Sequence, residues 1–354
     1  MKKKLFALMM AMVMVLSLAA CGGQEQTTDE GGAESDNGGY KIAFSNSYVG
    51  NAWRTAAVNI FDAYTADLVE QGVLSKAYSS SAGDDVQAQI NEIRNMMSEG
   101  YDAIVCIAAS ATGLQSVLEE AAERGIVVVC FDTTVDSDLV YNVNTDQFEY
   151  GRLLAQSLAD RMGGEGNILW IKGIEGNQVT LDRTEGMQSV LDNYPGINVL
   201  GDGYGKWDDS TTASVMSNLM SAYASQGIDG ILSEGGGGHA IVQSLVENGI
   251  DPATLPISEG EMFNSFMKDW VEMDLDAFCT AQPPYLAAAA VDVALKVLNG
   301  EEVEPMTYVD LPTCSSKEEA EEKWYQPDQE GGFVCDWTDN NNTWNLTIED
   351  VAPN

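Results

Sequence analysis

Short apolar segments alternate with helical segments from about residue 40 to residue 298, and this alternation constrains the fold more than any other feature of the sequence. Residues 102–108 (DAIVCIA) and 126–131 (IVVVCF) are continuous apolar runs, typical of strands that a parallel sheet buries on both faces. Between them, residues 114–121 carry apolar side chains at helical spacing. Strands and helices that alternate in this way predict parallel sheets with right-handed crossovers.

The same alternation starts again near residue 148, with strand-like runs at 167–172, 230–233 and 277–281. Two such series predict an α/β protein with two doubly wound parallel-sheet lobes. Ligands of doubly wound folds bind beyond the carboxyl ends of the strands. Two lobes that face each other there would enclose a ligand cleft between them.

The N-terminus has the parts of an export signal: a basic stretch at residues 2–4, the apolar residues 5–16, and small residues directly before Cys21. The apolar run is too short to span a bilayer comfortably, and its flanks are those of a signal peptide. Small residues before a cysteine form a lipobox, which resembles the site where bacterial lipoprotein signals are cut. We therefore predict a signal peptide over residues 1–20 and export to the outer face of the cell membrane or the periplasm. Lipid on Cys21 would be the only membrane attachment.

Residues 22–39 contain no large apolar residue and cannot bury a core, so we predict a disordered tether over residues 21–39. The chain has 17 Lys and Arg against 55 Asp and Glu, a net charge of −38, and loss of the three signal lysines takes it to −41. This charge repels nucleic acid and anionic lipid, so we expect neither as a partner. It also disfavours a highly anionic ligand.

The six cysteines and the single histidine show no pattern of a catalytic or metal site. No CxxC pair, zinc-type cluster, GxSxG, HExxH or GxxxxGK[ST] motif occurs, so we predict no cofactor, no metal and no enzymatic activity. Carboxylate pairs leave a glycosidase as the remaining enzyme hypothesis. Export would permit a disulfide between Cys314 and Cys335, but spacing alone does not show that the two lie together.

Nine short segments occur in a fixed order between Lys41 and Glu304. They are FSNSYVGNAWR (44–54), GYDAIVCIAAS (100–110), GIVVVCFDTTV (125–135), NVNTDQFEYG (142–151), GNQVTLDRTEGM (176–187), GKWDDS (205–210), GILSEG (230–235), ISEGEMFNSF (257–266) and TAQPPY (280–285). In this order they resemble the periplasmic sugar-binding proteins of ABC transporters, of the ribose- and galactofuranose-binding type.

The resemblance implies a type I periplasmic binding protein fold, in which a three-strand hinge joins the lobes. It implies an N-terminal lobe of residues 40–145 plus 283–309 and a C-terminal lobe of residues 146–282 plus 310–354. It also implies a monomeric solute-binding protein that delivers a sugar to ABC permease subunits. A sensor subunit that presents its ligand to a membrane receptor would share this fold and site, so it stays an alternative.

A sugar site needs planar polar groups for the hydroxyls and aromatic side chains for the ring faces. Asp132 directly follows the apolar run 126–131, where a doubly wound fold places ligand groups, although a turn or N-cap aspartate would look the same. The match to the family's ligand loop implies Trp53 on the sugar ring and Arg54 on its hydroxyls, with Asn51 beside them. The alternative is a helix start that Asn51 caps, with Trp53 in the core.

The resemblance places further residues at the ligand. Trp207 would cover the other ring face and Gln282 of the hinge would bond the ligand, unless Trp207 is only a surface or hinge residue. Thr133 stands where ribose binders carry arginine, which puts ribose in doubt. Arg183 falls two positions after the family's contacting arginine, so it contacts the ligand or braces its loop against Asp182.

Two segments depart from the family pattern. Relatives carry Asn-Asp after the strand GILS, whereas this chain has Glu234, four glycines and His239. Glu234 or His239 would substitute, unless the run is only a flexible loop. The family's aspartate of the second lobe falls within SEGEMFN, where Glu259, Glu261 and Asn264 compete, and we select Glu261 and Asn264 as candidates.

We predict a neutral sugar as the ligand, and we expect a hexose or a furanose form rather than ribose. The Trp53-Arg54 pair resembles the galactofuranose-binding branch, and the negative charge of the protein would slow the approach of acidic sugars. A nucleoside, a cyclitol or a furanose signal molecule are alternatives, because Trp53 and Trp207 would stack a purine as readily as a sugar.

Overall fold

The computed structural model describes residues 38–352. The predicted signal peptide, the predicted lipidation site Cys21 and all but the last two residues of the predicted tether lie outside the described residues. Within residues 38–352, we find no helix with the length and apolar character that a membrane crossing requires.

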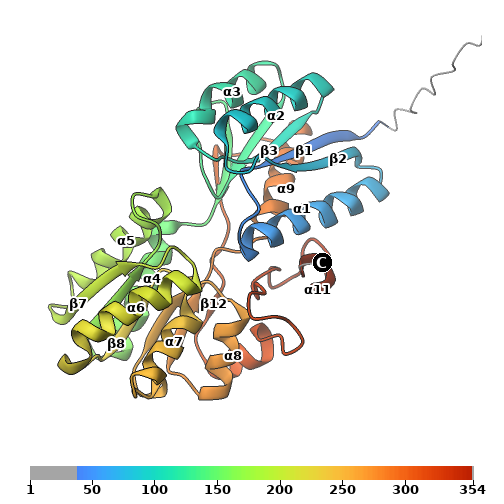
Figure 1. The fold of residues 1–354 in the computed structure, drawn as a ribbon. Coiled ribbons are helices and arrows are strands. Elements are labelled where there is room, and N and C mark those ends of the chain that lie inside the picture. The colour runs from blue at the N-terminus through green and yellow to red at the C-terminus, as the bar shows by residue number, and fades with distance from the viewer. Residues whose placement is uncertain (1–37, 353–354) are drawn as a thin grey trace, which may run out of the picture. The chain divides into compact units, whose positions relative to one another are not determined.

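The first lobe is a six-stranded parallel sheet with helices on both faces (Figure 1). Its strands are β1 (Tyr40–Asn46), β2 (Leu74–Ser81), β3 (Ala103–Ile107), β4 (Val127–Phe131), β5 (Tyr141–Asn144) and β11 (Met306–Tyr308), and its helices are α1 (Ala52–Glu70), α2 (Val86–Glu99), α3 (Ala111–Glu123) and α9 (Leu286–Leu298). The strand order is β11-β5-β4-β3-β1-β2. Helices α2 and α3 cover one face, and α1 and α9 cover the other. Strand β3 is buried along its whole length because both faces are covered.

The second lobe repeats this architecture with the order β12-β10-β9-β8-β6-β7, in which only β12 is antiparallel. Its strands are β6 (Glu165–Lys172), β7 (Gly196–Tyr204), β8 (Gly230–Ser233), β9 (Ile257–Gly260), β10 (Ala277–Thr280) and β12 (Thr313–Cys314). Its helices are α4 (Gln147–Arg161), α5 (Gln178–Leu191), α6 (Asp209–Tyr223), α7 (Gly238–Glu247) and α8 (Asn264–Met273), with short 3₁₀ turns at Ala224–Gln226 and Pro252–Thr254. Helices α4 and α5 pack on one face of the sheet.

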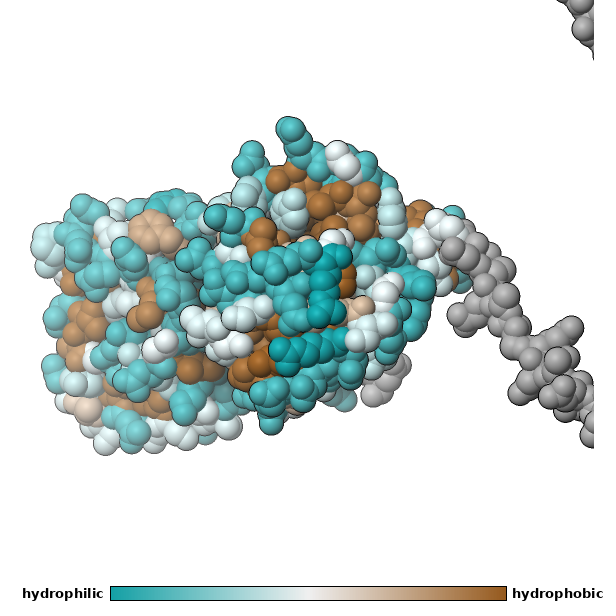
Figure 2. Space-filling view, turned by 90° about the horizontal axis from the view of Figure 1, so that it is seen from above, coloured by the Kyte–Doolittle hydropathy of each residue, from teal (hydrophilic) through white to brown (hydrophobic). Residues whose placement is uncertain are grey.

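The chain passes between the two sheets three times: between β5 and α4, between β10 and α9, and between β11 and β12. The predicted fold class is therefore confirmed as α/β, with two doubly wound parallel-sheet lobes and a three-strand hinge. The exact lobe boundaries, after residues 145, 282 and 309, stay a prediction. Polar side chains cover most of the face of the molecule seen in Figure 2, with apolar residues scattered between them.

A C-terminal tail follows β12 and contains α10 (Lys317–Glu319), a π-helical turn (Ala320–Trp324) and α11 (Ile348–Val351). Its first part packs against α8, and α11 packs against α1 of the first lobe. The predicted assignment of residues 310–354 to the C-terminal lobe did not anticipate the contact with α1. That contact joins elements more than 270 residues apart in the sequence, and no local pattern in the tail encodes it.

The cysteines of the described residues are buried free thiols. Cys106 and Cys130 are partners in the adjacent strands β3 and β4, and Cys279 and Cys314 are partners in β10 and β12. Cys335 lies in the tail near the start of α8. The disulfide considered between Cys314 and Cys335 is not formed, because β12 pairs Cys314 with β10 and the tail carries Cys335 elsewhere.

Candidate ligand-binding site

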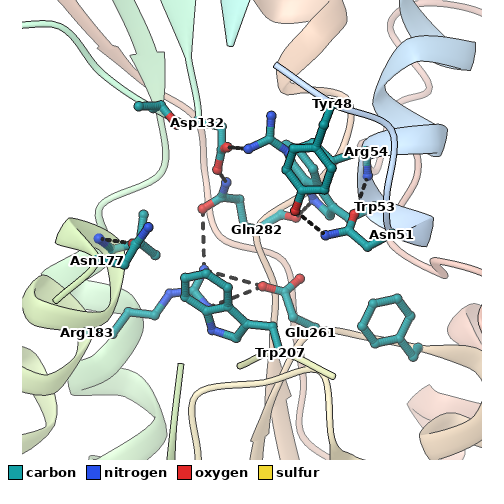
Figure 3. Close-up of a pocket in the computed structure, with 13 residues that line it drawn as sticks. Tyr48, Asn51, Trp53, Arg54, Asp132, Asn177, Arg183, Trp207, Glu261 and Gln282 are labelled. Carbon is teal, nitrogen blue, oxygen red and sulfur yellow. Dashed lines mark hydrogen bonds and ion pairs between the residues drawn. The ribbon is translucent and has the colours of Figure 1, made fainter. Parts of the chain in front are cut away.

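A cavity of about 690 Å³, including its open mouth, lies beyond the carboxyl ends of the strands and is lined by loop and helix residues of both lobes (Figure 3). All the predicted ligand residues except Glu234 and Asn264 line it. They are Asn51, Trp53, Arg54, Asp132, Thr133, Arg183, Trp207, Glu261 and Gln282.

The first polar group of the pocket is built on Asp132, which follows β4. Its Oδ2 atom pairs with Arg54 Nη2 at 2.7 Å, and its Oδ1 atom accepts a hydrogen bond from Gln282 Nε2 at 2.6 Å. Both members of the ion pair are largely buried, with side chains 12% and 15% exposed. Asp132 has a φ of +61°, a left-handed conformation that few side chains adopt and that directs its carboxylate toward Arg54.

The second polar group joins Arg183 of α5 to Glu261, which follows β9. Arg183 Nη1 lies 3.3 Å from Glu261 Oε1, and the two side chains are 3% and 12% exposed. Burial raises the pKa of Glu261, although the charge of Arg183 opposes that shift. Arg183 Nε also donates to Gln147 Oε1 at 2.8 Å.

The two polar groups are connected through the hinge. Gln147 Nε2 donates to Gln282 Oε1, and Arg183 Nη2 approaches the same oxygen at 3.4 Å. Because Gln282 also bonds Asp132, a continuous chain of polar contacts runs from Arg54 of the first lobe to Glu261 of the second. Such connected networks hold side chains in fixed positions.

Aromatic rings border the pocket on both sides. Trp53 is only 9% exposed, and its indole Nε1 donates to the carbonyl oxygen of Gln282 at 2.6 Å. Tyr48 is more exposed, and the Arg54 guanidinium lies 5.2 Å from its ring centre. From the second lobe, Trp207 faces the pocket with a φ of +56°, and its buried Nε1 has no hydrogen-bond partner within the described part of the chain.

The segment around Asn51 combines a helix start with part of the pocket wall, and its contact with a ligand stays a prediction. Asn51 is the N-cap of α1, and its Oδ1 atom accepts a hydrogen bond from the Arg54 backbone N–H at 2.8 Å. Trp53 belongs to the core cluster, yet it also lines the pocket. The cap thus fixes the first turn of α1, which aims Arg54 at Asp132.

Glu234 and Asn264 do not line the pocket. The glycines after Glu234 turn the chain so that its carboxylate points inward, where it accepts hydrogen bonds from Gly173 N and Thr184 Oγ1. Burial raises the pKa of Glu234 to about 7, although these hydrogen bonds and Arg183 oppose the shift. Its carbonyl oxygen accepts from Arg183 Nη1 at 2.9 Å, so the residue orients a pocket arginine.

Asn264 starts α8 and faces the C-terminal tail, where its Nδ2 atom donates to the carbonyl oxygens of Gln326 and Gln329 at 2.8 and 2.9 Å. Glu259, Glu261 and Asn264 were the candidates for the position of the family's second-lobe aspartate. Glu261 alone lines the pocket, whereas Glu259 is buried away from it.

Four lining residues escaped the sequence reasoning: Tyr48, Asn177, Val179 and Phe263. Tyr48 and Phe263 are aromatic residues inside two of the quoted segments, so an aromatic count over those segments would have found them. Asn177 caps α5, and its Oδ1 atom accepts from Val179 N at 2.9 Å, which gives no signal beyond an ordinary helix start. Among the described residues, no group of three or more metal-ligating side chains is placed to hold an ion.

The fold and the pocket define a two-lobed binding protein whose ligand site lies between facing strand ends. The sequence model of the periplasmic binding protein domain matches residues 42–302, and the chain belongs to this family.

Curated relatives match about half of the chain. A xylitol-binding protein of Mycolicibacterium smegmatis is 27% identical over 172 residues, which cover 48% of this chain and 49% of that protein. A multiple sugar-binding periplasmic receptor of Rhizobium radiobacter is 31% identical over 199 residues, which cover 50% of this chain and 56% of that protein. The chain therefore spans about half the length of these relatives.

Solved structures share the fold over most of their length. An ABC transporter solute-binding protein of Thermobispora bispora has a TM-score of 0.74 at 20% identity, covering 88% of this chain and 95% of that one. The binding component of an arabinose ABC transporter from a Shewanella species, bound to arabinofuranose, has a TM-score of 0.69 at 25% identity, covering 79% and 93%.

Proposed function

We propose that this chain is an exported, lipid-anchored solute-binding protein that captures a neutral sugar between its two lobes for an ABC transporter. One observation carries the proposal: two arginine–carboxylate pairs share a pocket with aromatic rings from both lobes. A sugar presents hydroxyls around a ring with an apolar face, so it matches both kinds of group. Relatives named for xylitol and for several sugars support this class of ligand.

The charge of the pocket favours a neutral ligand. Arg54 is paired with Asp132, and Arg183 is paired with Glu261, so neither arginine is left free for a phosphate or carboxylate. An anionic ligand would have to displace one of these acids at the cost of a partly buried ion pair. A neutral hydroxyl can instead bond the paired groups without separating them.

The features of the site support a hexose or a furanose over ribose. Thr133 lines the pocket where ribose binders carry arginine, and Trp53 and Arg54 form the pair similar to the galactofuranose-binding branch. Proteins of similar fold have been solved with D-allose and with arabinofuranose, which supports ligands of this size. A cyclitol or a nucleoside remains the alternative for the same pocket, and a sensory role remains the alternative to transport.

A thermal-shift screen tests the proposal. The panel would hold D-galactose, D-fructose, L-arabinose, D-xylose, xylitol, myo-inositol, adenosine and glucose 6-phosphate. A neutral sugar or its alditol at about 100 times its Kd should stabilise the protein by about 2.7 kcal/mol. Stabilisation by adenosine or glucose 6-phosphate alone would contradict a neutral-sugar site.

A further inference from the structure

The C-terminal tail, residues 315–352, lies beyond the matched family domain and is held firmly by the second lobe. Asn264 Nδ2 donates to the carbonyl oxygen of Gln326 at 2.8 Å, and Asn264 Oδ1 accepts from Gln326 N at 2.9 Å. Phe263 forms an isolated antiparallel bridge with Val334 of the tail. Phe263 also lines the ligand pocket, so the tail contacts a segment that forms part of the pocket wall.

The end of the same tail is held by the first lobe. Trp344 Nε1 donates to Asp292 Oδ2 of α9 at 2.8 Å, and the Tyr64 hydroxyl of α1 donates to the other oxygen of this carboxylate at 2.5 Å. Asn59 Nδ2 of α1 donates to the carbonyl oxygen of Val351 at 3.3 Å. Trp344 and Val351 are both buried, which makes this a packed attachment rather than a loose contact.

The two attachments join the parts of the lobes that carry the ligand site. Trp53 and Arg54 lie in the first turn of helix α1, to which the end of the tail is attached. The attachment to the second lobe is at Phe263, two residues after Glu261. A second cavity is lined by Ala52 and Thr55 of α1 and by tail residues 330 and 332–334, so the tail runs beside the first turns of α1. Figure 1 shows the red tail passing between α8 and α1.

Between the attachments, residues 337–343 form a hydrogen-bonded turn. Thr343 N donates to Asp339 Oδ1 at 2.8 Å, and Asn342 N donates to the carbonyl oxygen of Asp339 at 3.1 Å. The eight Cα–Cα steps from residue 336 to residue 344 could span at most about 28 Å when fully extended. The tail therefore has spare length, but the turn must lose its hydrogen bonds before that length becomes available.

We propose that residues 315–352 form a strap, a fourth connection between the lobes that opposes the opening of the ligand site. Opening by the three-strand hinge separates α1 from the 261–263 segment. With the strap in place, this motion must unravel the turn at 337–343 or pull Trp344 from its site on α9. The strap thus lowers the population of widely open molecules. The inference rests on the proposed function in one respect only, because that function identifies a sugar as the molecule that enters when the lobes open.

The experiment measures the distance between the lobes without any ligand. Spin labels on Glu123→Cys, at the end of α3, and Asn193→Cys, after α5, report the distance distribution by pulsed electron spin resonance. Both positions are exposed, whereas the described native thiols are buried. One protein carries eight Gly/Ser residues inserted after Asn341 in the strap. The matched control carries the same insertion after Glu301, an exposed residue between α9 and β11.

The strap insertion should add a population at distances longer than any in the parent protein, and the control insertion should leave the parent distribution unchanged. Equal distributions in all three proteins would overturn the strap. A second variant, Trp344→Phe, retains an aromatic ring but removes the N–H that bonds Asp292 and part of the buried packing, so it should shift the distribution in the same direction. Melting curves would verify that each variant is folded. Failure of every sugar to bind would refute the proposed function, yet the distance comparison would still decide whether the strap exists.

Discussion

Replacement of Asp132 is the sharpest test of the ligand site, because this carboxylate joins two other pocket side chains, one from each side of the hinge. It accepts hydrogen bonds from Arg54 at 2.7 Å and from Gln282 at 2.6 Å. Removing it leaves a partly buried guanidinium without its counter-ion and ligand hydroxyls without an acceptor. A hydrogen bond to a charged group is worth about 1.5–3 kcal/mol. We expect a binding loss of about 2–3 kcal/mol, or roughly 30- to 150-fold in Kd.

Two variants separate binding from folding. Asp132 has a φ of +61°, where alanine costs about 1–2 kcal/mol of fold stability, whereas asparagine tolerates this conformation. Both variants leave the largely buried Arg54 guanidinium without its counter-ion, so both should lower Tm. Asp132→Ala should lower it further, because alanine adds the backbone strain. Both should weaken binding because both remove the charge.

Calorimetric titration with the sugar that the thermal-shift panel selects would give the Kd of each variant. Parental affinity in both variants would refute the reasoning and remove Asp132 from the site. Weak binding in the alanine variant alone would trace the loss to the backbone instead of the carboxylate.

Four further outcomes are expected. Cys21→Ser should release the protein from membranes, and unchanged retention in a membrane fraction would contradict the lipid anchor. Trp207→Ala should weaken sugar binding about tenfold or more by removing a ring contact, as calorimetric titration against the parent protein would show. Sugar affinity should change little between low and high salt in calorimetry, because the ligand is neutral. Burial raises the pKa of Glu234 to about 7 and of Glu259 to about 8, so the folded state holds protons that the unfolded state loses above about pH 4.5. Stability should therefore fall as pH rises from about 4.5 to 8, and Glu259→Gln should flatten this part of the Tm–pH curve.

Much of the fold could be predicted because its central strands are encoded locally. The runs at 102–108 and 126–131 are apolar throughout, and the structure makes them β3 and β4, buried between two helical layers. The tail gave no such signal. Its contacts with α1 and α9 join residues far apart in the sequence, and they depend on single side chains such as Trp344 rather than on a repeating pattern.

The pocket could be predicted in part, because residues that follow strands in a doubly wound fold gather at one edge. Asp132, Trp207 and Glu261 follow three different strands, and the structure brings all three to one cavity. Side-chain direction was harder to predict. Glu234 also follows a strand, but the glycines after it turn its carboxylate inward, and the bridge between Phe263 and Val334 leaves Asn264 facing the tail.

The buried thiols described above give the protein built-in reporters of how its parts unfold. Cys106 and Cys130 lie in the first sheet, whereas Cys279 and Cys314 lie in the second. Burial raises the pKa of Cys279 and Cys314, so these thiols resist alkylation until their surroundings open. Pulse alkylation followed by mass spectrometry can therefore time the exposure of each sheet separately. Simultaneous labelling of both pairs would mean that the lobes melt as one cooperative unit, and labelling of one pair first would give each lobe its own free energy of opening.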